Sequence, residues 1–201
     1  MKMIGLTGQS GSGKGTLAAL FFEAGIPVVD ADAVYHELLI PPSPCLDELR
    51  TEFTDAILNL DGTLNRPALA ALVFDPSDTA KARLKRLNEI THRYVTERTT
   101  ALLKDYAAQG NKAAVIDAPL LIEAGLHQRC DRVIVVLADR DVRIERLIAR
   151  DGLDRERVLA RLDAQPDVSF YIDHADILVY NNGTEQDLRA QFSCLLKEVL
   201  A

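Results

Sequence analysis

The sequence is short of three features, and each shortage argues against a class of protein. It has only three cysteines, Cys45, Cys130 and Cys194, and no C-x-x-C pair, which argues against a disulfide framework or a zinc site. Its 23 basic residues are outnumbered by 30 acidic ones, unlike a general nucleic-acid binder. No apolar run approaches membrane-spanning length, and no signal-peptide pattern is present. We therefore expect a single cytoplasmic domain with reduced thiols and with no nucleic-acid or membrane partner.

A glycine-rich stretch near the N-terminus carries the clearest functional signal. Residues 8–16 read Gly-Gln-Ser-Gly-Ser-Gly-Lys-Gly-Thr, between a strand-like run at 3–6 and apolar residues at helical spacing from Leu17. This order of strand, glycine loop and helix is typical of a P-loop, in which backbone N–H groups and a helix N-terminus bind phosphates. The sequence predicts an ATP site formed by Gly11, Ser12, Gly13, Lys14, Gly15 and Thr16, with Lys14 at the β- and γ-phosphates.

The loop departs from the usual P-loop pattern at one position. The pattern G-x-x-x-x-G-K-[ST] places a hydroxyl directly after the lysine, whereas this chain has Gly15 there and its hydroxyl one residue later, on Thr16. We expect Thr16, directly or through water, to contribute to a magnesium site. A glycine-rich turn in an unrelated loop is the alternative interpretation.

Two acids follow the next strand-like run, which covers residues 26–29. Because the carboxyl ends of parallel strands form the ligand-binding edge of an open α/β sheet, Asp30 and Asp32 are functional candidates. A kinase needs a group that accepts a proton from the acceptor hydroxyl, and we expect Asp32 to be this base. The alternative is that one of the two acids only caps the helix that follows.

Asp117 ends a third strand-like run, Ala-Ala-Val-Ile-Asp at 113–117. A hydrophobic strand that ends in an acid has the form of a Walker B segment, whose carboxylate orients magnesium directly or through water. Asp117 is therefore predicted to take part in the magnesium site together with Thr16. The alternative is a turn acid that precedes Pro119.

Arginine is concentrated in one segment, with seven arginines between residues 139 and 161. Arg143, Arg146 and Arg150 follow i, i+3, i+7 spacing and so share one side of a helix, where their like charges favour a bound anion or carboxylate. We expect Arg143 and Arg146 to act in catalysis and Arg150 to bind the nucleotide, as parts of a lid over the phosphates. The alternative is a solvated hairpin, because acids nearly balance these arginines.

Five strand-like runs, at 3–6, 26–29, 113–117, 132–137 and 176–180, predict an α/β fold with a parallel sheet. The helical stretch between the second and third runs is longer than an ordinary crossover, so part of it is expected to be an inserted subdomain that binds the acceptor. We predict a three-layer P-loop kinase core at 1–59, 113–138 and 166–201, a helical insertion at about 60–112 and a lid at about 139–165. The Asn181-Asn182-Gly183 turn is expected to meet adenine, with Asn182 as the binding residue.

Several of these motifs, in this order, resemble the dephospho-CoA kinase family. The resemblance rests on the P-loop, on Gly-Ile-Pro-Val-Val-Asp-Ala-Asp at 25–32, on Pro-Leu-Leu-Ile-Glu at 119–123, and on the positions of Arg146 and Arg150. It implies ATP- and magnesium-dependent phosphorylation of the ribose 3′-hydroxyl of dephospho-CoA, the last step of coenzyme A synthesis, with Asp32 as base. It further implies substrate contacts by Asp32, His92, Pro119 and Leu120.

The chain also differs from that family and leaves other functions open. His92 is followed by Arg93 where the family usually has proline, and a lone histidine on a helix is more often structural or exposed. The Gly-Lys-Gly-Thr end of the loop is similar to adenylate kinases, so a nucleoside or nucleoside-monophosphate kinase is an alternative. The Asp-Ala-Pro-Leu-Leu sequence at 117–121 lacks the Asp-Gly-Phe-Pro-Arg of those enzymes. A non-catalytic ATP-binding regulatory module is a third possibility. A monomer or weak homo-oligomer is expected.

Overall fold

The computed structural model describes residues 1–200, and the chain divides into two compact units. We call residues 1–30 with 105 onward the sheet unit, and residues 31–104 the helical unit. The strands of the sheet unit are β1 (Lys2–Gly8), β2 (Val28–Asp30), β3 (Ala113–Asp117), β4 (Arg132–Leu137) and β5 (Ile177–Tyr180). Its helices are α1 (Lys14–Glu23), η2 (Leu126–Arg129), α6 (Arg140–Asp151), α7 (Arg155–Asp163), α8 (Val168–Ile172) and α9 (Glu185–Leu200).

The strands form one sheet in the order β2-β3-β1-β4-β5, and neighbouring strands are parallel. Alanine, valine and isoleucine fill β3 and β4, which are buried over nearly their whole length, as expected of strands covered on both faces. In the register of the sheet, Asp30 lies opposite Asp117, which lies opposite Leu6. The predicted five-stranded parallel sheet is confirmed, with β1 at its centre.

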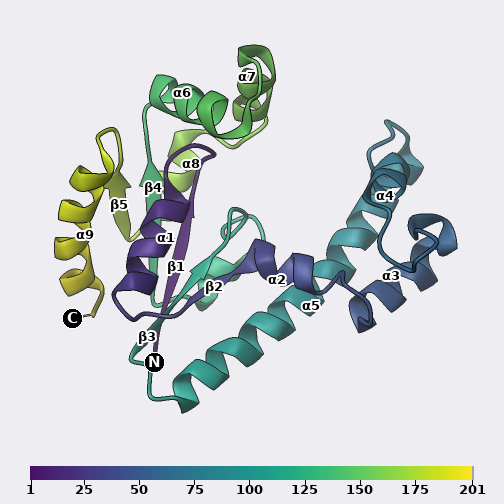
Figure 1. The fold of residues 1–201 in the computed structure, drawn as a ribbon, viewed down its shortest axis with the longest axis horizontal. Helices are drawn as coiled ribbons and strands as arrows, with labels where there is room; N and C mark the ends of the chain where they lie inside the picture. Colours follow the sequence, from purple (N-terminus) through teal and green to yellow (C-terminus); the bar gives the residue numbers. More distant parts are fainter. Residues whose placement is uncertain (201) are drawn as a thin grey trace. The chain divides into compact units, whose positions relative to one another are not determined.

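Residues of β1 pack against two different layers of the sheet unit. Helices α1 and α9 are seen on one side of the sheet in Figure 1. Ile4 and Leu6 belong to a hydrophobic core shared with α1 and α9, which cover one face of the sheet. On the other face, Gly5 allows the segment after β3 to approach, since a Cβ there would lie 2.6 Å from Cδ2 of Leu121. The short helix α8 packs against β4. The sheet therefore lies between two layers, as a three-layer core requires.

Helices α6 and α7 form a hairpin inside the predicted lid segment. Gly152 ends α6 in a left-handed conformation, and the Asp154 side chain caps α7 by accepting a hydrogen bond from the N–H of Arg157. The hairpin has a small core of its own, formed by Ile144, Leu147, Val158 and Leu162. The α8 helix that follows has no counterpart among the predicted elements, because five residues are too few to show helical periodicity.

The helical unit holds α2, α3, η1, α4 and most of α5, and the boundary with the sheet unit falls inside α5. Ser43 and Asn65 cap α3 and α4, and each cap is followed by a proline in the first turn, where a missing N–H costs nothing. Across residues 1–200 no helix combines the length and apolar character needed to cross a membrane. The bounds are α2 (Ala31–Glu37), α3 (Pro44–Phe53), η1 (Asp55–Ile57), α4 (Arg66–Val73) and α5 (Asp78–Ala108).

The helical unit begins earlier in the chain than the predicted insertion. We expected it to cover about 60–112, with residues 31–59 in the sheet core, whereas the compact unit is residues 31–104. The reason lies in its hydrophobic core, where Cys45 and Leu49 of α3 pack with Leu69 of α4 and Ile90 of α5. An amphipathic helix joins the unit in which its apolar face is buried, so α3 belongs with the later helices.

Candidate active site

The glycine-rich loop joins β1 to α1, and two of its glycines are required by the geometry. Gly11 and Gly13 have φ values of +81° and +93°, in the left-handed region that favours glycine. A Cβ on Gly11 would lie 2.9 Å from the carbonyl oxygen of Arg143, and one on Gly13 would lie 2.1 Å from Nδ2 of Asn181. The loop is thus packed directly against α6 and against the segment that follows β5.

Carbonyl groups of the loop are engaged by side chains from these two neighbours. The Ser10 oxygen accepts a hydrogen bond from Nε of Arg143 at 2.9 Å, and the Ser12 oxygen accepts one from Nδ2 of Asn181 at 2.8 Å. At the start of α1, Thr16 and Leu17 donate their N–H groups to the Gly13 carbonyl, whereas the N–H groups of Lys14 and Gly15 have no acceptor within the helix, and the helix dipole adds positive charge there. An uncapped helix N-terminus with N–H groups left to donate is what a phosphate site requires, and the bonded carbonyls hold the loop in place beside it.

Ser12 shapes the loop rather than offering its hydroxyl to the surface. Its N–H donates to the Gln9 carbonyl at 3.1 Å, and its side chain is fully buried. Within residues 1–200 the hydroxyl has no hydrogen-bond partner, and it lies 2.9 Å from where a Cβ on Gly8 would be. The residue therefore fills the space beneath the loop.

Gly15 and Thr16 lie in the first turn of α1. A Cβ on Gly15 would meet no atom within 4 Å, so the geometry does not require glycine at this position. The Thr16 N–H donates to the Gly13 carbonyl at 3.0 Å, which leaves its hydroxyl as a separate donor or ligand. The hydroxyl of this loop is thus on Thr16, one residue later than in the usual pattern. At Gly15, where the usual pattern has a serine or threonine, a side chain would also fit.

Lys14 and Asp117 form an ion pair across the ends of β1 and β3. The lysine Nζ donates to Oδ1 of Asp117, and the two side chains are 19% and 7% exposed. Thr7, in β1, donates through Oγ1 to the Pro119 carbonyl at 3.1 Å and so ties the segment after β3 to the central strand. The pair brings together the residue predicted for the phosphates and the residue predicted for magnesium.

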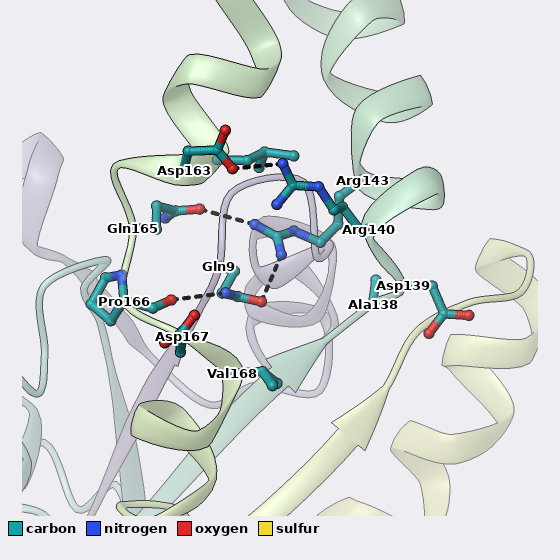
Figure 2. A pocket seen from close by; sticks show the side chains of 11 residues that line it. Gln9, Ala138, Asp139, Arg140, Arg143, Asp163, Gln165, Pro166, Asp167 and Val168 are labelled. Atoms are coloured by element: carbon teal, nitrogen blue, oxygen red, sulfur yellow. Dashed lines mark hydrogen bonds and ion pairs between the residues drawn. The ribbon is translucent and has the colours of Figure 1, made fainter.

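The three lid arginines have three different environments. Arg143 is 5% exposed and donates to Ser10, Gln9 and Gln165, and burial lowers the pKa of its guanidinium (Figure 2). Arg146 is half-buried and donates to the carbonyls of Asn181 and Gly183, at 2.9 and 3.0 Å. Arg150 is exposed and forms a bidentate pair with its neighbour Asp151, at 2.6 and 2.9 Å. They share a helix side, but each has its own set of protein acceptors.

Two adjacent asparagines follow β5, and only one of them contacts the glycine loop. Asn181 is buried, and its amide donates to the Ser12 carbonyl. Asn182 is exposed, and its Oδ1 accepts a hydrogen bond from the N–H of Asp139 at 2.7 Å. Asn182, the residue predicted to meet adenine, thus links the turn after β5 to the start of α6.

Comparison with known proteins identifies the family. The family model for dephospho-CoA kinase matches residues 2–187. A dephospho-CoA kinase from Corynebacterium efficiens is 42% identical over 200 residues, which cover 100% of this chain and 98% of that protein. The chain belongs to the dephospho-CoA kinase family.

Solved structures match this chain over nearly its whole length and show the same fold. The structure of TT1252 from Thermus thermophilus matches with a TM-score of 0.81 and 34% identity, over 98% of this chain and 97% of that one. A dephospho-CoA kinase from Campylobacter jejuni matches with a TM-score of 0.73 and 24% identity, over 99% and 98% of the two chains, which supports the fold. The P-loop kinase fold predicted from the sequence is thereby confirmed, and the predicted kinase class is confirmed by the family match.

The remaining predicted site residues are distributed over both units. Asp32 and His92 belong to the helical unit, where Asp32 is exposed in the first turn of α2 and His92 is exposed on α5. Pro119 and Leu120 belong to the sheet unit, directly after β3, and Leu120 is 56% exposed. For this dephospho-CoA kinase family member, the roles of these four residues are taken up as proposals below.

The structure adds three residues that sequence reasoning missed, namely Gln9, Gln165 and Asn181. Gln9 and Gln165 connect the glycine loop to the segment after α7, with Gln9 Nε2 donating to the Pro166 carbonyl at 3.1 Å. Uncharged amides in loops carry no periodicity and no charge signal, so they are found only through their contacts. For Asn181 the sequence offers one weak signal, which is its position in a turn directly after a buried strand.

Proposed function

We propose that this chain transfers the γ-phosphoryl group of ATP to the ribose 3′-hydroxyl of dephospho-CoA, giving ADP and coenzyme A. The proposal is carried by the family match over nearly the whole chain, on a molecule whose glycine loop offers fixed carbonyls and an uncapped helix N-terminus. Phosphoryl transfer depends mainly on positioning and on stabilising charge, which is what such a loop supplies. ATP is the phosphoryl donor.

Lys14 and two of the lid arginines are assigned to the phosphates. Lys14 exchanges its contact with Asp117 for the β- and γ-phosphates, where its charge stabilises the transferring group. Arg146 lies beside the carbonyls around the loop and serves in catalysis, while the exposed Arg150 leaves Asp151 to bind the nucleotide. Arg143, which the sequence also predicted to be catalytic, is assigned to positioning the loop instead, because its three guanidinium nitrogens all donate to the protein.

Magnesium is assigned to Asp117 and Thr16. A carboxylate and a hydroxyl are hard oxygen donors of the kind that magnesium takes, and in kinase sites one or two such groups act together with substrate phosphates. Asp117 is buried beside Lys14, and the Thr16 hydroxyl lies on the same first turn of α1 as Lys14. When bound, the ion neutralises phosphate charge, while Asp117 and Thr16 orient it directly or through water.

The contacts to the acceptor are assigned to Asp32, Pro119 and Leu120, with His92 as a further candidate. Asp32 lies two residues beyond the end of β2 and accepts the proton of the 3′-hydroxyl as general base. Leu120 is an exposed apolar side chain suited to an organic substrate, and Pro119 fixes the backbone next to it. His92 is a weaker candidate for the acceptor, because Arg93 follows it in place of proline.

We further propose that the enzyme works in the cytoplasm as a monomer or weak homo-oligomer. Its substrates are small molecules, and its formal net charge of −7 does not favour a nucleic-acid partner. Sedimentation of the purified protein at several concentrations tests the assembly state, and a stable dimer or larger complex would contradict it.

The activity is tested by following ATP-to-ADP conversion with magnesium present and with dephospho-CoA, AMP, CMP or no acceptor. We expect turnover with dephospho-CoA well above the rate without acceptor. Turnover only with a monophosphate would instead support the nucleoside-monophosphate kinase that the Gly-Lys-Gly-Thr sequence suggests. Binding of ATP without turnover of any acceptor would support a regulatory module.

A further inference from the structure

Arg143 is a buried charge whose three acceptors are all neutral. Its Nε donates to the Ser10 carbonyl at 2.9 Å, one terminal nitrogen donates to Oε1 of Gln9 at 2.7 Å, and the other to Oε1 of Gln165 at 3.0 Å. Only 5% of the residue is exposed. The planar guanidinium therefore uses all three of its nitrogens on the protein, with two contacts on the glycine loop and one beyond it.

The acceptors of Arg143 are themselves connected, so the contacts form a closed network (Figure 2). Oε1 of Gln165 also accepts the N–H of Ser10 at 3.0 Å, and the Gln9 amide donates to the Pro166 carbonyl. Both the N–H and the carbonyl of Ser10 are thus fixed, one by Gln165 and the other by Arg143. Because the N–H and the carbonyl of Ser10 belong to the two successive peptide groups on either side of this residue, holding both leaves little freedom for either peptide to rotate, and the network defines the start of the loop.

The same network connects the loop to both ends of the α6–α7 hairpin. Arg143 lies in the first turns of α6, and Gln165 lies two residues after α7 ends at Asp163. The loop backbone also touches α6 directly, since a Cβ on Gly11 would lie 3.1 Å from Cα of Arg143. The base of the hairpin and the start of the glycine loop are therefore held as one piece.

We propose that Arg143 is a positioning residue for the nucleotide, which holds the glycine loop in its phosphate-binding shape and couples that shape to the base of the α6–α7 hairpin. This deepens, and rests on, the kinase function proposed above. The role depends on the geometry of the guanidinium fork, with one nitrogen for each of three acceptors. A lysine would keep the charge but could not reach the three acceptors with the same geometry.

The experiment compares Arg143→Lys and Gln165→Leu with the control Arg140→Ala. Arg140 lies on the same helix and lines the same cavity of about 410 Å³ beside Gln9 (Figure 2), but it is exposed and pairs with Asp163 at 2.6 Å. Three quantities are measured for each variant. They are hydrogen exchange of the loop amides without ligand, dissociation constants for ADP and a non-hydrolysable ATP analogue, and KM for both substrates.

We expect Arg143→Lys and Gln165→Leu to raise exchange of the Ser10 and Ser12 amides, which donate to Gln165 and to the Gln9 carbonyl, about tenfold or more, and to weaken binding of both nucleotides by a similar factor. KM for dephospho-CoA should stay within about twofold, and Arg140→Ala should match the unmodified enzyme in every measurement. If Arg143 and Gln165 only stabilised the fold, their variants would have a lower melting temperature without this selective change in loop exchange and in nucleotide affinity.

The proposal would be overturned if Arg143→Lys had the same amide exchange and the same nucleotide affinity as the unmodified enzyme. So would weaker binding of the ATP analogue with unchanged ADP affinity and unchanged exchange, because that result marks a direct γ-phosphate contact. If Arg143→Lys does not fold, the same measurements on Gln165→Leu test the proposal, because Gln165 is only half-buried. Exchange and ADP binding need no acceptor, so failure of the dephospho-CoA assay is distinguishable from failure of this proposal.

Discussion

The two units of this molecule use polar side chains in opposite ways. Around the glycine loop, Arg143 and Asn181 are each 5% exposed and hold backbone carbonyls of another element. In the helical unit, polar contacts join the outer faces of helices, as in the pair between Arg86 and Glu52 at 3.0 Å, whose side chains are 46% and 37% exposed. The contacts of Arg143 and Asn181 fix the shape of a loop. The pair between Arg86 and Glu52 lies on a surface whose shape is already fixed by apolar packing.

The difference matters because the energy of a polar contact depends on its exposure to water. Removing one partner of a buried hydrogen bond costs about 1–3 kcal/mol, since the remaining group stays without a partner. Breaking an exposed ion pair costs about 0–1 kcal/mol. The glycine loop should therefore be sensitive to single polar substitutions, whereas the surface of the helical unit should tolerate them.

Asp32→Asn should be the exception to this comparison and should have the largest effect among the four tests considered. Asp32 is exposed in the helical unit, so its loss should barely affect stability, but as the general base it should contribute about 10²–10⁴-fold to turnover. We expect kcat to fall by that factor with nucleotide affinity nearly intact. Steady-state kinetics and nucleotide titration check this, with Glu37→Gln on the same helix as control. Unchanged kcat would remove Asp32 from the catalytic role.

Lys14→Met tests the charged pair beneath the phosphates. Loss of one transition-state contact should lower kcat about 10²–10³-fold. It should also leave Asp117 buried without its lysine, so Lys14→Met should lower the free energy of unfolding more than Lys14→Met combined with Asp117→Asn. Steady-state kinetics of both variants measure the effect on kcat, and urea unfolding of both measures the effect on the free energy of unfolding. Equal stability of the single and double variants would show that the pair contributes nothing to the fold.

Asn181→Leu and Arg86→Ala test the comparison directly. The first leaves the Ser12 carbonyl without its side-chain amide donor and should lower the free energy of unfolding by about 1–3 kcal/mol. The second breaks exposed ion pairs and should cost less than about 1 kcal/mol. Urea unfolding at one pH ranks them. A larger loss for Arg86→Ala would reverse the account of the two units.

At neutral pH the smallest expected effect concerns one thiol in each unit. Burial raises the pKa of Cys45 and that of Cys130 to about 11, from 9.0. Between pH 9 and 11 the unfolded chain releases these protons while the folded chain keeps them, so this contribution to stability is present below pH 9 and is lost as the pH rises. Replacing both residues with alanine should flatten the fall in unfolding free energy over that range. An identical slope in the variant would contradict the assignment.

Much of the sheet unit could be predicted from the sequence because its signals are local. The runs at 113–117 and 132–137 became strands with those same bounds, and the glycine loop lies between β1 and α1 as predicted. Side-chain partners could not be predicted in this way. Helical spacing placed Arg143, Arg146 and Arg150 on one side of α6, but only the close approach of Gly11 decides which of them is buried.

The roles of adjacent residues and the limits of the helical unit also required the structure. Whether Asn181 or Asn182 faces the glycine loop depends on where β5 ends and on how the chain then turns. Likewise, the start of the helical unit depends on which core receives the apolar face of α3, and this is a tertiary contact. The roles of Asp32 and His92 toward the acceptor stay predictions.

The most direct test of the account is the ratio of coenzyme A formed to ADP formed when the purified protein acts on dephospho-CoA, ATP and magnesium. The product is separated by chromatography, and phosphorus NMR identifies the position of the new phosphate. We predict one coenzyme A for each ADP, with the phosphate on the ribose 3′-oxygen. ADP formed without coenzyme A, or a phosphate at another position, would contradict the assignment as a dephospho-CoA kinase.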